Sequence, residues 1–107
     1  MSETVTHKGK VWLWTSPTSP GRWHFLTIDG VAGEAIAAHE AMRRLEFGRG
    51  RGFGSVKVRV RVGASEWNTS VFPASETGGY ILPLKAAIRK AEGIAQGSEV
   101  TAELELL

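Results

Sequence analysis

A chain of 107 residues is long enough for one domain and too short for a second independent core. Its 42% hydrophobic and 22% charged residues are typical of a globular protein, and the absence of cysteine excludes disulfides, thiolate metal sites and cysteine nucleophiles. The formal net charge is only +2, and no apolar run reaches membrane-spanning length. The first ten residues lack the apolar centre of a secretory signal, so we expect a cytoplasmic protein that contacts no membrane.

The small net charge hides an asymmetry along the chain. Residues 43–61 hold seven Arg and Lys residues against Glu46 alone, a charge of +6, which leaves −4 for all other residues. A basic segment of this kind indicates an anionic partner such as nucleic acid. The alternative is that these cations pair with glutamates elsewhere on the surface, as solvated charges usually do.

Alternating apolar residues predict a hairpin near the start of the chain. The segments 8–14 and 22–28 alternate with the period of β-strands, and the stretch between them is rich in the proline and glycine of turns. We expect one domain over residues 8–107, preceded by a flexible segment over residues 1–7.

A change of period after Asp29 predicts a helix. Asp29 is a candidate N-cap, and the four glycines within residues 47–54 end the helix. Apolar residues recur between them at spacings of four, three, four and three, which is the stripe of an amphipathic helix: Val31, Ala35, Ala38, Met42 and Leu45.

The segment 55–62, SVKVRVRV, is the clearest strand of the chain. Its valines point to one face and its three cations to the other. The Gly63-Ala64 pair predicts a tight turn into a strand over 65–72, which makes a second hairpin. A short strand over 80–83 ends at Pro83.

A second helix is expected over 84–92, with Pro83 at its first turn and Gly93 in the left-handed conformation that ends it. Its buried side comprises Leu84, Ile88 and Ala91. The last strand covers 99–106 and buries alternate residues: Val100, Ala102, Leu104 and Leu106.

The order of these elements repeats, because each half of the chain contains two strands, a helix and a third strand. Two β-β-α-β halves are compatible with one small barrel, which leaves no strand edge exposed and whose openings the two helices could cover. We therefore expect a fold that is mainly β with two helices.

Three segments carry a family resemblance: the Val-x-Val-x-Val strand, the WNTSVFP run at 67–73, and the run LPLKAAIRKAEGI at 82–94. In these segments the chain resembles the bacterial family called domain of unknown function 1905, with a match from about Trp12 to Leu106. The resemblance implies a small double-split β-barrel, distantly similar to AbrB-type swapped-hairpin DNA-binding domains. Two chains complete one barrel in those domains, whereas this chain carries both halves, so we expect a monomer or a weak homodimer. The family name implies no activity.

Residues for catalysis or metal binding are sparse. The three histidines lie on different expected elements, and His39-Glu40 lacks the second histidine of a zinc-binding helix. The GRGRGFG segment has its glycines after a helix and before a strand, which is the reverse of a phosphate-binding loop. We expect no catalytic residue, metal or cofactor, and Arg49 and Arg51 remain candidates for phosphate contact.

The stripe of Lys57, Arg59 and Arg61 is the main candidate site. Alternate residues of a strand lie roughly 6–7 Å apart, which is comparable to the phosphate spacing of one nucleic-acid strand. Trp67 on the expected partner strand would add an aromatic side chain beside these cations, and small barrels hold single strands on such surfaces.

A small-molecule or enzymatic pocket is the alternative. Some of the four tryptophans must fill the barrel, as core or as plugs at its ends, but Trp12, Trp23 or Trp67 could line a pocket with Tyr80 and Lys85 at its mouth. The sequence thus favours a non-enzymatic module that binds an anionic partner such as nucleic acid. The candidate ligand-binding residues are Arg49, Arg51, Lys57, Arg59, Arg61, Trp67, Tyr80, Lys85 and Arg89.

Overall fold

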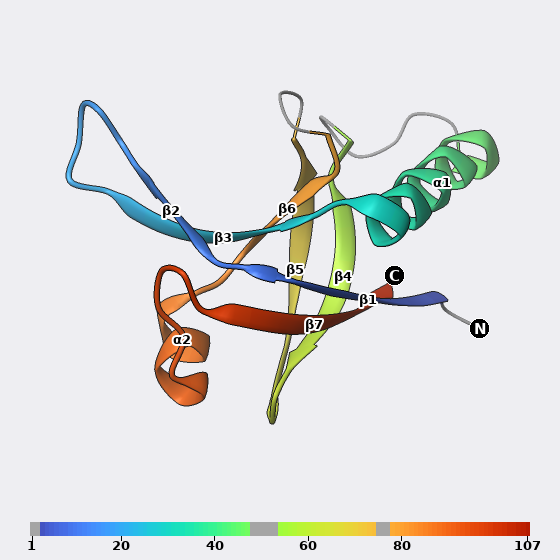
Figure 1. Ribbon diagram of the computed structural model, residues 1–107. Helices are drawn as coiled ribbons and strands as arrows, with labels where there is room; N and C mark the ends of the chain where they lie inside the picture. The colour runs from blue at the N-terminus through green and yellow to red at the C-terminus, as the bar shows by residue number, and fades with distance from the viewer. Residues whose placement is uncertain (1–2, 48–53, 75–77) are drawn as a thin grey trace.

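The computed structural model describes residues 3–47, 54–74 and 78–107, which form seven strands and two helices (Figure 1). The predicted class, mainly β with two helices, is confirmed. In chain order the elements are β1 (Glu3–Lys10), β2 (Trp12–Thr15), β3 (Arg22–Ile28), α1 (Gly30–Phe47), β4 (Val56–Val62), β5 (Ser65–Pro73), β6 (Tyr80–Pro83), α2 (Ala86–Glu92) and β7 (Glu99–Leu106).

The strands form one curled antiparallel sheet in the order β1-β7-β4-β5-β6-β3-β2. The two strands at the ends of this order, β1 and β2, are consecutive in the chain and separated only by Val11. The sheet therefore curls so strongly that its first and last strands, β1 and β2, follow each other directly in the chain. β4 and β5 run across the direction of β1, β3 and β7 (Figure 1).

Two long extended segments, β5 and the segment formed by β1 and β2, each pair with one neighbour along their first part and with another along their second part, as expected of a double-split barrel. β5 pairs with β4 along Ser65–Val71 and with β6 through Phe72 and Pro73. The β1–β2 path pairs likewise with β7 through β1 and with β3 through β2. The two β-β-α-β halves, β2-β3-α1-β4 and β5-β6-α2-β7, are thereby interleaved in one sheet.

The interior is filled by alternate residues of the strands, because successive side chains of a strand point to opposite faces. Val58 and Val60 of β4 face Leu106 and Leu104 of β7 in register, and all four are at most 1% exposed. The expected inward faces of the segments 55–62 and 99–106 are confirmed.

We expected the domain to start at residue 8, but β1 already begins at Glu3. Glu3–Lys10 pairs with β7 along its whole length, from Glu3 opposite Leu106 to Lys10 opposite Glu99. Val11 interrupts the path between β1 and β2, and its own backbone groups bond to the chain before β7: its N–H donates to Ser98 O at 2.9 Å and its carbonyl accepts from Gly97 at 2.8 Å. The break therefore leaves neither group unpaired.

Helix α1 lies where the sequence placed it, but its expected contact face is wrong. The buried residues of α1 are Ala32, Gly33 and Ile36, whereas Val31 and Leu45 of the apolar stripe are 84% and 81% exposed. Asp29 precedes the helix, and its carboxylate lies 3.4 Å from Nε2 of His7 on β1.

Helix α2 is shorter than expected, because Pro83 belongs to β6 and the helix begins at Ala86. Leu84 and Ile88 are buried as expected, but Ala91 is exposed. Gly93 ends the helix with φ 64°, and the Ile94 N–H donates to Arg89 O at 2.8 Å, so the predicted left-handed cap is confirmed.

The close approach of the chain before β6 to the end of β3 predicts a graded effect of alanine at two adjacent glycines. Gly78 and Gly79 both have φ above +70°, so alanine at either position costs about 1–2 kcal/mol in backbone strain. A Cβ at Gly78 meets no atom of the described residues within 4 Å, whereas one at Gly79 would overlap Ile28 O. We expect Gly79→Ala to lower the free energy of unfolding by about 1–3 kcal/mol more than Gly78→Ala, measured by urea denaturation. Equal losses for the two variants would contradict this packing.

Candidate binding surface

The outer face of β4 and β7 is a ladder of opposite charges. Register places Arg59 opposite Glu105 and Arg61 opposite Glu103. Arg61 Nη2 lies 2.9 Å from Glu103 Oε1 and Arg59 Nη1 lies 3.7 Å from Glu105 Oε1. Arg59 Nε also donates to Asn68 Oδ1 at 3.3 Å on β5. The cross-strand pairing that the sequence left as an alternative thus occurs at two of the three stripe cations.

Lys57 differs from the two arginines, because it forms no ion pair with any residue of the described ranges. It lies on the outer face at the other end of β4, where it lines a shallow depression of about 500 Å³ with Phe72, Ser70 and Leu107. Phe72 is 47% exposed, so an aromatic surface lies beside this cation.

Trp67 and Tyr80 are on the inner side of the sheet and do not join the cations. Trp67 faces Val60 in register and is 8% exposed, so the expectation that it flanks the basic stripe is wrong. Tyr80 faces Ile28 and is equally buried, and this burial raises the pKa of its phenol. A pocket that combines either residue with Trp12 or Trp23 would have to pass through the sheet.

The aromatic residues of the outer face are instead on the β2–β3 hairpin. Trp14 lies opposite Trp23, and Trp12 lies opposite Phe25 with ring centroids 5.1 Å apart. Trp12 Nε1 donates to Thr27 Oγ1 at 2.9 Å, which fixes the orientation of its ring. These four aromatic side chains and Ile81 of β6 line an open depression of about 310 Å³.

Trp14 and Trp23 expose 43% and 55% of their surface, which is unusual for residues of this size. The same outward face continues across the sheet from Ile81 to Phe72, its partner on β5, and then to Ser70 and its partner Lys57 on β4. We call this face, from Trp14 to Lys57, the aromatic track. Sequence reasoning predicted the hairpin but expected tryptophans in the core or at the ends of the barrel, since alternation alone does not say which face is covered.

Lys85 and Arg89 lie near the base of the hairpin and outside the aromatic track. Leu84 connects them to β3: its N–H donates to His24 O at 2.9 Å, and its carbonyl accepts from Arg89 Nε at 3.0 Å. Lys85 is exposed and forms no ion pair among the described residues. His24 Nδ1 is buried and has no hydrogen-bond partner among the described residues.

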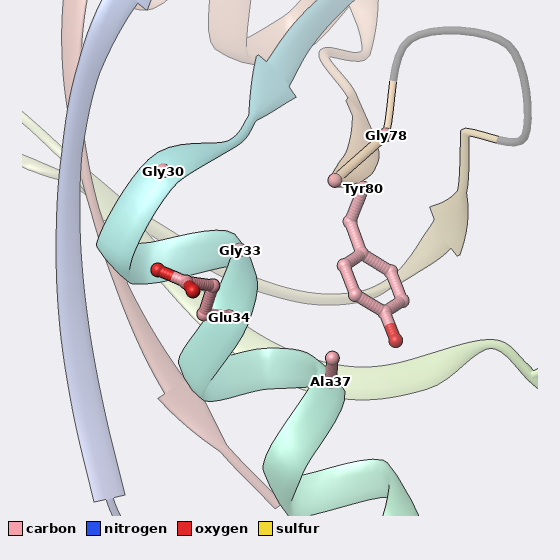
Figure 2. A pocket seen from close by; sticks show the side chains of 7 residues that line it. Gly30, Gly33, Glu34, Ala37, Gly78 and Tyr80 are labelled. Carbon is pink, nitrogen blue, oxygen red and sulfur yellow. The ribbon is translucent and has the colours of Figure 1, made fainter.

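A cleft of about 380 Å³ lies between α1 and the start of β6, lined by Gly30, Gly33, Glu34, Ala37, Gly78, Gly79 and Tyr80. Figure 2 shows the Tyr80 ring beside α1 near Ala37. Two of these glycines serve close packing, because a Cβ on Gly33 would lie 2.8 Å from Ile28 O and a Cβ on Gly79 would overlap the same atom. Among the described residues of the lining, Glu34 is the only one with a charged side chain, and a carboxylate does not favour an anionic ligand.

The remaining candidates add little to these surfaces. Arg49 and Arg51 lie outside the described residues. Within the ranges that are described, no cluster of three or more His, Asp or Glu side chains could hold a metal ion. Neither helix there combines the length and the apolar composition needed to cross a membrane.

One protein family matches the chain: the model of a domain of unknown function, DUF1905, aligns with residues 8–104. No curated protein matches the chain.

The environment of His24 predicts a loss of stability in mild acid. Its partial burial, and the charges of Arg89 and Arg22, lower the pKa of His24 from its ordinary value of 6.5. As pH falls below 6.5, His24 therefore becomes protonated in the unfolded chain before it does so in the folded protein. The free energy of unfolding falls over this range, until the pH reaches the lower pKa that His24 has in the folded state. We expect His24→Gln to weaken this acid dependence, measured as the free energy of unfolding in urea from neutral pH to about pH 5.

The variant keeps His7 and His39, so the difference between the two curves isolates His24. Parallel curves for the wild type and His24→Gln would contradict the prediction.

Proposed function

The chain belongs to the DUF1905 family, whose description assigns no activity, and we propose that it is a non-enzymatic module that binds single-stranded nucleic acid along the aromatic track. Unpaired bases would stack on Trp14, Trp23 and Phe72, and a phosphate would lie at Lys57. A paired base exposes only its edge to such a surface, so the proposal requires an unpaired strand.

The observation that supports this proposal is the outward display of tryptophan. Trp14 and Trp23 together offer two large rings on adjacent strands, with Trp12 held in place beside them by its bond to Thr27. Base–aromatic stacking contributes about 1–3 kcal/mol per base and tolerates any sequence. Rings that the sheet already orients lose little conformational entropy on binding.

The charges of the outer face indicate that stacking, rather than phosphate contact, would dominate the affinity. Arg59 and Arg61 are paired with Glu105 and Glu103, so their field is largely neutralised at a distance. Lys57 is the stripe cation that we place in the site. Binding would therefore fall with added salt, but with a small slope.

A planar small molecule is the second candidate ligand. The depression beside Trp12, Trp14, Trp23 and Phe25 is about 310 Å³ and has an almost wholly apolar lining, which suits one aromatic ring system. Such a ligand would occupy the hairpin alone, whereas an oligonucleotide would also need Phe72 and Lys57. Bacterial origin, a cytoplasmic location and the distant similarity to AbrB-type domains stay predictions from the sequence.

Removal of either exposed tryptophan tests the stacking platform. We expect Trp14→Ala and Trp23→Ala each to weaken binding of a labelled oligothymidylate by about one to two orders of magnitude, measured by fluorescence anisotropy at low salt. Val31→Ala, at another exposed apolar position, is the control. A duplex of the same length should bind more weakly than the single strand. Unchanged affinity in the Trp14→Ala/Trp23→Ala double variant would refute the proposal.

The charge ladder predicts opposite effects of two charge changes. Lys57→Ala should lower the slope of log affinity against log salt concentration by about 1. Glu103→Gln with Glu105→Gln should raise the affinity for oligothymidylate, because Arg59 and Arg61 lose their carboxylate partners and their charge becomes available to phosphate. Both variants are checked by the same anisotropy titration at several salt concentrations. An affinity for oligothymidylate that does not rise when the two glutamates are replaced would contradict this prediction.

A further inference from the structure

The β2–β3 hairpin has a second face, opposite to the aromatic track. Along β3, Trp23 and Phe25 line the aromatic depression, whereas Leu26 points into the core and is fully buried. Successive side chains of a strand alternate between its two faces, so His24 and Arg22 share the face of Leu26. His24 is half-buried and Arg22 is exposed. The inner face of the sheet therefore ends in two basic side chains where the hairpin extends beyond β6.

The segment that leads from β6 into α2 adds a third basic side chain. Leu84 lies beside His24, because its N–H donates to His24 O at 2.9 Å, and its carbonyl accepts from Arg89 Nε at 3.0 Å. One residue between them thus holds the half-buried guanidinium of Arg89 near His24. The two Nη groups of Arg89 have no acceptor among the described residues, so they can donate to a ligand.

These three basic groups lack a counterion in the described part of the chain. Arg22 and Arg89 form no ion pair there. Burial, the charge of Arg89 and the charge of Arg22 all lower the pKa of His24, in that order of size. The residues of β2 opposite Arg22 and His24 are uncharged. Glu92, the acidic residue of α2, accepts instead from Ser65 Oγ on β5, at 2.6 Å.

The imidazole of His24 has one nitrogen left for a ligand. Nδ1 is buried and has no hydrogen-bond partner among the described residues, whereas Nε2 is not buried. The neutral ring carries one proton, and placing it on Nε2 leaves a lone pair rather than an N–H at the buried Nδ1. Nε2–H is then a donor at the surface of a site that already contains two guanidinium groups.

We infer that Arg22, His24 and Arg89 form a binding site for a doubly charged tetrahedral oxyanion, such as a terminal phosphate group. Guanidinium groups match the geometry of phosphate oxygens, and hydrogen bonds between ionised partners are the strong ones. A bound dianion would also offset the repulsion among the three basic groups. The inference is independent of the proposed nucleic-acid binding, because this site lies on the face of β3 opposite to the aromatic track.

The site predicts that binding takes up a proton. In the free protein His24 is neutral over the range between its lowered pKa and the ordinary value of 6.5. A dianion beside the ring stabilises the protonated form and raises the pKa of His24 in the complex. Affinity should therefore rise as pH falls through the pKa of the complex, and level off below the pKa of the free protein.

Isothermal titration of the full chain with sulfate tests both statements, because sulfate keeps its double charge over the range from about pH 7.5 to about pH 5.5. Sulfate should bind more tightly at the acidic end. Arg22→Gln and Arg89→Gln should each raise its dissociation constant by about tenfold or more. Lys57→Gln, an equal loss of charge in the aromatic track, should leave the dissociation constant unchanged. His24→Gln should still bind sulfate, with most of the pH dependence lost.

The source of the phosphate group is distinguished by three further probes at one pH. Inorganic phosphate and methyl phosphate should bind, and tighter binding of methyl phosphate would indicate the terminal phosphate of a larger molecule. Dimethyl phosphate, with the single charge of a nucleic-acid linkage, should bind more weakly than both. Equal affinity for all three would contradict a site for a doubly charged group.

A direct measurement follows the imidazole of His24 by NMR, with its signals assigned by their loss in His24→Gln. Sulfate should move the titration of His24 to higher pH and leave the signals of His7 and His39 in place. Arg22 is exposed, so Arg22→Gln should keep the fold and reduce this displacement. A titration of His24 that sulfate does not move, or an affinity that neither arginine variant weakens, overturns the proposal.

Discussion

The register between β4 and β7 is the constraint on which the rest of the structure depends. Val60 opposite Leu104 sets the interior of the sheet, and the same register places Arg61 opposite Glu103 outside. A slip of one residue would turn every valine of β4 outward and bury its three cations, so burial alone specifies the pairing strongly. The ion pairs then add little free energy, because each is about half exposed, but they neutralise the outer face.

This neutralisation changes the meaning of the basic segment in the sequence. Counted along the chain, residues 43–61 form an excess of positive charge, yet Glu103 and Glu105 lie more than forty positions away from the arginines that they pair with. Alternation is a local property, so it predicts β4, β5 and β7 correctly, but it placed one strand over 8–14 where the chain forms β1 and β2 with a break at Val11. Which strands become neighbours is decided by long-range topology, and one sequence carries no local signal of it.

The two faces of an element illustrate the same limit. For α1, both the stripe that includes Val31 and the side with Ala32 and Ile36 are apolar, and periodicity alone favoured the longer stripe. For the strands, tryptophan was expected inside because its burial is favourable, and Trp67 obeys this rule. Trp14 and Trp23 do not, since the β2–β3 hairpin extends beyond β6 and nothing described covers its outer face. In each case the exception is a surface that remains available for binding.

With the proposed binding along the aromatic track, the domain would separate stability from recognition within a single sheet. On the half formed by β1, β7 and β4, polar side chains satisfy one another, and ligands would have to compete with pairs such as Arg61–Glu103. On the half formed by β2, β3 and β6, the outer face is aromatic, and Trp14 and Trp23 stay exposed although they lie opposite each other. Exposed tryptophans contribute little to folding, so their retention on the surface needs a reason outside the fold. The proposed ligand would supply that reason, because covering the rings would recover the apolar burial that folding leaves unused.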